Sequence, residues 1–164
     1  MINVTNSNQQ LHQYAIEYES ATKRFEKLVA SLSDGDLDVK HADGWSARQI
    51  IHHVADSEAQ SYARIRRLMA EPLGSVIQGY DEAAWANNPT LGYEELDVKN
   101  SFAVFSAVRA STLDLIRRMD SSDLDRYGEH SESGRYPVST WFQSYVRHPD
   151  DHANQLKRAV KGLL

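Results

Sequence analysis

The chain has no cysteine among its 164 residues, and this absence excludes several kinds of chemistry. Disulfide bonds, thiolate nucleophiles and thiolate metal ligands are all ruled out. Any metal ion must therefore be held by imidazole or carboxylate groups. The seven histidines consequently become the residues to follow along the chain.

Excess positive charge and long apolar runs are missing as well. The net charge of −5 argues against a nucleic-acid binder, because affinity for phosphate backbones depends on clustered Lys and Arg. No apolar run approaches the roughly 18 residues that a membrane-spanning helix needs. Residues 1–8 have neither the basic start nor the apolar stretch of a signal peptide. We expect a cytoplasmic protein that binds neither nucleic acid nor membranes.

The chain has one basic cluster, in which Arg64, Arg66 and Arg67 lie within four residues of one another. A phosphate site is one possibility. The arginines alternate with Ile65 and Leu68, however, and this pattern favours the solvated flank of a helix.

Four stretches have apolar side chains at three- and four-residue steps, which is typical of amphipathic helices. They cover residues 7–32, 46–70, 96–119 and 139–161. Ser46 has Gln49 three residues later, the spacing of a capping box at the start of the second helix. The pattern predicts an all-α protein, a four-helix bundle with long connections, and a single domain over residues 1–164.

The connections between these helices are rich in turn-forming residues. Residues 33–44 should form a loop, and a short helical turn is expected near Asp81. In residues 120–138, Ser133 and Gly134 predict a turn between two short extended pieces.

A histidine pair on the last helix is the strongest chemical signal. His148 and His152 are four residues apart, so they lie about 40° apart on one face, beside the apolar stripe. This spacing lets two imidazole nitrogens reach one metal ion. A bundle can also place such a pair at its edge with ordinary hydrogen bonds, and from spacing alone both interpretations stay open.

The second helix carries two adjacent histidines, and helical geometry separates them. His53 lies about 60° from Ile50, at the edge of the core-facing stripe. His52 lies near the middle of the polar face and is predicted to be a surface residue. His53 is thus the candidate ligand. The remaining histidines are expected to be solvated or in loops: His12, His41 and His130.

Several carboxylates could accept the second N–H of a metal-bound imidazole. Asp150 and Asp151 stand between the paired histidines, although solvent exposure is the favoured interpretation for both. Asp56 and Glu58 are further candidates, and Glu58 falls within the apolar stripe, so it needs a partner if buried.

Pro149 is unexpected in the middle of a helix, because proline removes a backbone hydrogen bond and clashes with the preceding turn. A kink there would free the carbonyl of Tyr145 and reorient His148 relative to His152.

Three segments together resemble a known family: GWSARQIIHHVADSE at residues 44–58, YDEAAW at residues 80–85 and HPDDH at residues 148–152. They are similar to the DinB/YfiT-like superfamily, and most of all to its YfiT branch of metal-dependent hydrolases. The resemblance spans about residues 40–160. Pro149 departs from the family's pattern.

The resemblance implies a four-helix bundle, commonly a homodimer, with one divalent metal ion, zinc or nickel, on three histidines. Matched motif to motif, these ligands are His53, His148 and His152. The family includes hydrolases and transferases that use low-molecular-weight thiols, so a small-molecule substrate and activation of water or thiol are implied. A non-catalytic metal-binding or interaction module with a vestigial site is the alternative.

The sequence identifies no general base. Tyr80, Trp85 and Tyr145 could line a pocket, although packing in the core is the favoured role for each.

Overall fold

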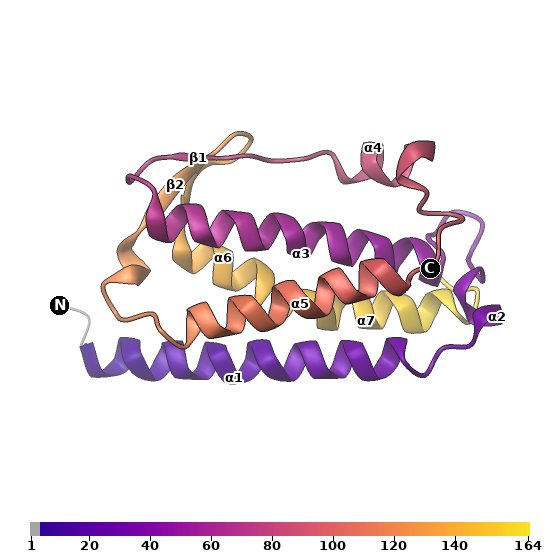
Figure 1. The fold of residues 1–164 in the computed structure, drawn as a ribbon, viewed down its shortest axis with the longest axis horizontal. Helices are drawn as coiled ribbons and strands as arrows, with labels where there is room; N and C mark the ends of the chain where they lie inside the picture. The colour runs from indigo at the N-terminus through magenta and orange to yellow at the C-terminus, as the bar shows by residue number, and fades with distance from the viewer. Residues whose placement is uncertain (1–3) are drawn as a thin grey trace.

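The computed structural model describes residues 4–164, with side chains from residue 8 onward. Residues 1–3, part of the segment considered for a signal peptide, lie outside the described residues. The long helical elements are α1 (Val4–Val29), α3 (Ala47–Ala70), α5 (Lys99–Ile116) and the pair α6 (Val138–Tyr145) and α7 (His148–Ala159). They confirm the predicted all-α four-helix bundle (Figure 1).

The order of the helices around the bundle differs from their order in the chain. Helix α1 packs against α5 and α7, and α3 packs against the same two helices. Consecutive long helices α1 and α3 are therefore diagonal to each other. Figure 1 shows α1 and the α6–α7 pair running one way and α3 and α5 running the other. This arrangement requires the long connections that the sequence contains.

Helix α3 carries most of the buried polar groups, and its start matches the sequence prediction. The Ser46 hydroxyl accepts a hydrogen bond from the Gln49 amide, and the Gln49 side chain accepts one from the Ser46 amide. This capping box satisfies two of the amides that a helix leaves unpaired at its N-terminus. The phase of α3 is thereby fixed just before its two histidines.

The last helix is not continuous, so the prediction of one helix over residues 139–161 was wrong. It breaks between Tyr145 and His148, and Pro149 lies in the first turn of α7. Proline is tolerated there because its missing N–H would have no helical partner anyway. The prediction that the carbonyl of Tyr145 is freed was correct, because it accepts from Arg109 Nη1 at 2.8 Å.

Short elements complete the connections. The loop predicted at 33–44 contains a short helix, α2 (Asp34–Leu37), and the expected helical turn near Asp81 is α4 (Glu82–Ala86). The two predicted extended pieces are β2 (Tyr127–His130) and β3 (Gly134–Pro137), an antiparallel hairpin with Gly134 at a positive φ of 75°. The remaining short elements are η1 (Pro89–Leu91) and η2 (Asp123–Asp125).

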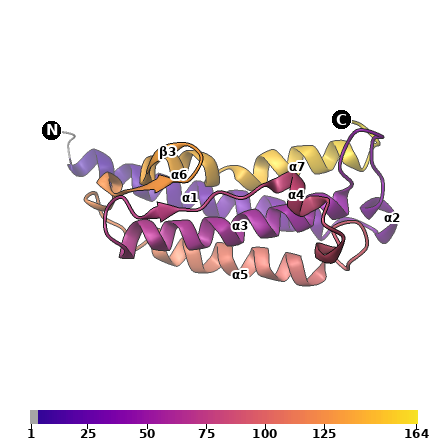
Figure 2. The same ribbon diagram turned by 90° about the horizontal axis from the view of Figure 1, so that it is seen from above.

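A third strand, β1 (Val76–Ile77), pairs in parallel with β2 and was not predicted. From β1 the chain runs back along the outer side of α3 to α4, as Figures 1 and 2 show. We call residues 78–85, which follow β1 and include most of α4, the strap. It brings side chains from a segment without helical periodicity over the middle of α3.

Two apolar clusters fill the bundle. One surrounds Trp141 and Tyr18 at the hairpin end, and the other surrounds Phe25 and Ile50 toward the opposite end. Among the described residues, no helix combines the length and the apolar composition needed to span a membrane.

Candidate metal centre

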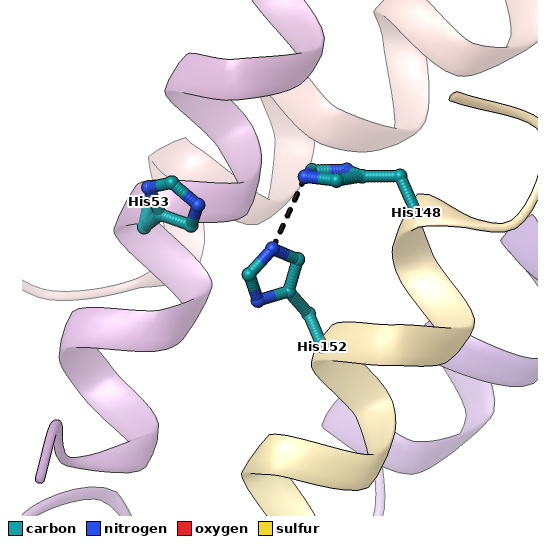
Figure 3. A group of neighbouring side chains, drawn as sticks. All are labelled: His53, His148 and His152. Carbon is teal, nitrogen blue, oxygen red and sulfur yellow. Dashed lines mark hydrogen bonds between the residues drawn. The ribbon is translucent and has the colours of Figure 1, made fainter. Parts of the chain in front are cut away.

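Three histidines from two helices converge in the interior of the bundle. His53 comes from α3, and His148 and His152 come from successive turns of α7 (Figure 3). One nitrogen from each ring lies within 4.8 Å of the other two. Helix periodicity explains the arrangement, since residues four apart share a face and α3 packs directly on α7.

The hydrogen bonds of the α7 pair fix which nitrogens face inward. His148 Nδ1 lies 3.0 Å from the carboxylate Oε1 of Glu58, and His152 Nδ1 lies 2.8 Å from the amide oxygen of Gln155. Both acceptors lack a proton to give, so each Nδ1 is the N–H donor. In the neutral rings the two Nε2 atoms then carry lone pairs.

These two Nε2 atoms are only 3.1 Å apart. Two lone pairs at this separation repel unless a proton or a cation lies between them. Nitrogens bound at 2.0–2.1 Å to one tetrahedral ion lie about 3.3 Å apart, close to the observed distance. The buried Nδ1 of His53 also has no hydrogen-bond partner among the described residues. The donor set and its spacing therefore fit a divalent metal ion.

Burial keeps the imidazoles of His53 and His152 neutral, which is the form that binds metals. It lowers the pKa of His53 to about 3, with the charges of His152 and His148 adding to the effect. Burial also lowers the pKa of His152 to about 4, again with a contribution from His148. Near neutral pH, protons therefore do not compete for their ring nitrogens.

The carboxylate that holds His148 is itself buried and paired. Glu58 is 1% exposed and forms an ion pair with Arg109 Nη1 at 3.1 Å. Desolvation alone would raise the pKa of Glu58, but Arg109 and the bond to His148 leave it lowered. The other acceptors of the Arg109 guanidinium are the Thr22 hydroxyl and the carbonyls of Tyr18 and Tyr145. A network through four helices thus orients one imidazole.

The prediction that His52 is a surface residue was wrong. It is 4% exposed, and its ring nitrogens hydrogen-bond the Ser101 hydroxyl and the Leu96 carbonyl. Its side of α3 is covered by α5 and the segment before it, which helical periodicity on α3 cannot reveal. None of the other histidines belongs to the three-residue cluster of the described residues.

Of the four carboxylates considered as acceptors for a histidine of the centre, the structure places one against such a histidine. Glu58 accepts from His148, as its place in the apolar stripe suggested. Asp150 instead accepts from Arg24 of α1, Asp151 is exposed, and Asp56 accepts from the hydroxyl of Tyr93. The idea that Asp150 supports a histidine was wrong, because its side of α7 faces α1.

Other groups near the centre were not expected from the sequence. The Ser57 hydroxyl is 3.3 Å from His148 Nε2, and the Trp45 ring packs edge-on against His53, with centroids 5.0 Å apart. Glu82 of α4 places its Oε2 4.0 Å from His53 Nε2 and is half exposed. Ser57 lies one helical turn after His53, a spacing that could have indicated its position.

The aromatic candidates lie in two environments. Tyr145 is buried in the apolar cluster around Trp141, as the core interpretation holds. Tyr80 and Trp85 pack against each other in the strap, with ring centroids 4.7 Å apart, and both are partly exposed.

Comparison with known proteins identifies the family and agrees with this fold. The profile of the DinB superfamily matches residues 17–156, and the chain belongs to this superfamily. A protein of Oceanobacillus iheyensis is 29% identical over 92% of this chain and 86% of its own length. One of Bacillus mycoides is 28% identical over 83% and 77%. Each is named "putative metal-dependent hydrolase".

A solved structure shares the architecture. YfiT from Bacillus subtilis aligns with a TM-score of 0.81 at 24% identity, covering 93% of this chain and 87% of YfiT. It is described as "a probable metal-dependent hydrolase with an unusual four-helix bundle topology". At this identity the likeness establishes the fold alone.

Proposed function

We propose that this chain is a metal-dependent hydrolase in which His53, His148 and His152 hold one divalent ion, zinc or nickel. The observation that carries the proposal is the 3.1 Å separation of the Nε2 atoms of His148 and His152, while the Nδ1 atom of each ring already lies within hydrogen-bond distance of an acceptor. Three neutral ligands leave the full charge on the ion. A divalent ion so bound lowers the pKa of a coordinated water or thiol.

The chain's own groups then have defined parts in the reaction. The bond from His148 to Glu58 holds that ring in one tautomer. Glu82 is half exposed and close to His53, so its carboxylate can take a proton from the nucleophile at the solvent side of the centre. The burial of His53 and Ser57 excludes water from the opposite side.

The first test is metal content. Untagged protein, purified without a metal column, should hold close to one zinc or nickel ion per chain by plasma mass spectrometry. Replacing any of His53, His148 or His152 by alanine should abolish binding, whereas His12→Ala, at an exposed position, should leave it intact. Less than about 0.1 ion per chain, with no change in melting on adding zinc or nickel, would overturn the proposal.

The second test separates hydrolysis from thiol transfer. Turnover of ester, amide and epoxide substrates is compared with and without an added low-molecular-weight thiol, because the chain has no thiol of its own. Activity without thiol, reduced in Glu82→Gln while metal content is unchanged, supports the hydrolase. Strict dependence on thiol assigns the chain as a transferase. A metal-loaded protein inactive under both conditions is a binding module.

We further propose that residues 1–164 form one domain and that two chains associate as a homodimer in solution. One cooperative unfolding transition and a light-scattering mass near twice 18.6 kDa are the expected results. Two separated transitions, or the mass of a single chain, would contradict the respective part.

A further inference from the structure

A second buried arginine lies on the same face of α3 as the metal centre, and its surroundings differ from those of Arg109. Arg64 is 9% exposed and was predicted to be solvated, which the structure contradicts. Its Nη1 donates to the Tyr145 hydroxyl at 2.7 Å and its Nη2 to the Gln78 carbonyl at 3.0 Å. Within the described part of the chain, no carboxylate pairs with it.

The contrast with Arg109 indicates that the positive charge of Arg64 serves to bind an anion from outside the chain. Arg109 is buried more deeply, at 1% exposed, but Glu58 neutralises it and every one of its nitrogens has an acceptor. Among the residues that the structure describes, Arg64 has only neutral hydrogen-bond partners, and its buried Nε has none. A buried charge without a counter-ion is costly, so a purely structural arginine is normally paired.

A second unsatisfied donor lies beside it. Among the described residues, the buried Tyr80 hydroxyl in the strap has no close hydrogen-bond partner, although the Ser57 side chain lies near enough to influence its pKa. The Tyr80 ring centroid is 5.9 Å from the guanidinium carbon of Arg64. The ring itself is partly exposed, so solvent reaches this residue. Burial raises the pKa of Tyr80 to about 12, which keeps the hydroxyl a donor at neutral pH.

These donors are connected to the metal centre by direct neighbours. Tyr145, which binds Arg64, packs against His148 with ring centroids 5.5 Å apart. His53 and Arg64 are 11 residues apart on α3, so they share a face with Cα atoms separated by about 16 Å along the axis. Side chains on a helix lean toward its N-terminus, which brings the guanidinium closer to the histidines.

From this arrangement we propose that Arg64 and Tyr80 bind a carboxylate of the substrate while its reacting group lies at the histidine centre. One positive charge and two free donors match a monoanion with two oxygens. Glu82 and Asp56 nearby add negative charge that disfavours a phosphate dianion. The substrate class is a small organic acid with its cleavable bond several atoms from the carboxylate. This inference rests on the proposed function of the metal centre.

The test uses the full-length protein freed of metal by a chelator, so that the anion cannot bind the ion. The nitrogen–proton signals of the arginine Nε groups are followed by NMR during titration with acetate, benzoate or inorganic phosphate, with chloride at matched ionic strength as reference. The Arg64 signal, identified by its loss in Arg64→Lys, should shift and saturate with the two carboxylates. Chloride and phosphate should leave it in place.

Two variants make the result specific. Tyr80→Phe removes a hydroxyl that forms no close hydrogen bond within the described part of the chain, so the fold should persist while benzoate affinity falls about 5- to 10-fold. Arg67→Gln removes a neighbouring exposed arginine that pairs with Glu71, and it should change nothing. An unmoved Arg64 signal, an equal shift at Arg67, or tighter binding of phosphate than of benzoate would overturn the inference.

Metal binding, measured separately in the same variants, keeps the two proposals distinguishable. Tyr80→Phe should bind zinc as the unaltered protein does. Carboxylate binding without any metal binding would support the carboxylate site and contradict the proposed metal-dependent hydrolase. Metal binding without carboxylate binding would support the metal centre and contradict the carboxylate site.

Discussion

At the scale of single residues, the centre depends on what holds each imidazole by its second nitrogen. His148 is held by Glu58 and His152 by Gln155, and both acceptors lie outside the cluster itself. Such acceptors fix the tautomer and the ring orientation, and their loss typically weakens metal affinity 10- to 100-fold. The two acceptors differ in burial and charge, so they predict different results.

Replacing Gln155 by leucine should weaken zinc affinity about 10-fold with little effect on folding, because only the acceptor of His152 is lost. Competition with a chromophoric chelator measures the affinity. Asn154→Leu is the matched control, since Asn154 is exposed on the same helix. Equal affinities of the two variants would show that Gln155 does not position His152.

Replacing Glu58 by glutamine should lower the free energy of unfolding by about 3 kcal/mol, because the charge of the buried Arg109 loses its counter-ion. Urea unfolding of the metal-free protein measures the loss. Glu19→Gln, which removes a carboxylate paired with Arg117 at the surface, should cost less than about 1 kcal/mol. Similar losses in both variants would mean that the Glu58–Arg109 pair contributes no more than a surface one.

At the scale of secondary structure, the break between α6 and α7 shapes the centre. The Tyr145 carbonyl has no helical donor at Pro149 and is bound by Arg109 instead, and the same guanidinium binds Glu58. The break thus connects the backbone of α6 to the carboxylate that holds His148. Pro149 lies in the first turn of α7 and, contrary to its expected mid-helix position, does not disturb the pair of histidines.

Replacing Pro149 by alanine should therefore leave zinc affinity within about twofold and destabilise the protein by about 0.4–1 kcal/mol, because the unfolded chain gains freedom. Thermal unfolding and chelator competition measure the two effects. A large change in affinity, together with increased helix content by circular dichroism, would show that proline keeps α6 and α7 apart.

At the scale of the whole molecule, the buried histidines couple folding to pH. Their folded-state pKa values, about 3 for His53 and about 4 for His152, lie below the ordinary value near 6.5. The unfolded chain therefore binds protons at a higher pH than the folded chain does. The stability of the metal-free protein is full above about pH 6.5 and is lost as the pH falls toward these lower values.

The expected loss is about 1 kcal/mol per pH unit from each of the two histidines between pH 6.5 and 4. Urea unfolding at a series of pH values measures it on the metal-free protein. His152→Asn should show a shallower dependence, since one of the two groups is gone. A stability that does not change between pH 6.5 and 5 would contradict the burial of these rings as neutral groups.

The sequence by itself determined the features that depend on local periodicity and spacing. Four amphipathic stretches gave the bundle, the capping box at Ser46 fixed the start of α3, and the four-residue spacing of His148 and His152 placed them on one face. The choice of His53 over His52 as the residue that faces the α7 histidines followed from the same geometry. These conclusions need only the pitch of a helix and the preference of apolar groups for the core.

Only the tertiary structure decided which distant groups meet. The ion pair of Glu58 with Arg109 joins residues 51 positions apart, and no local pattern relates them. The burial of His52 and Arg64 depends on α5 and on the strap, which cover sides of α3 that carry polar residues. A helix records in its sequence where its apolar face lies, but not which polar side chains a neighbouring segment will enclose.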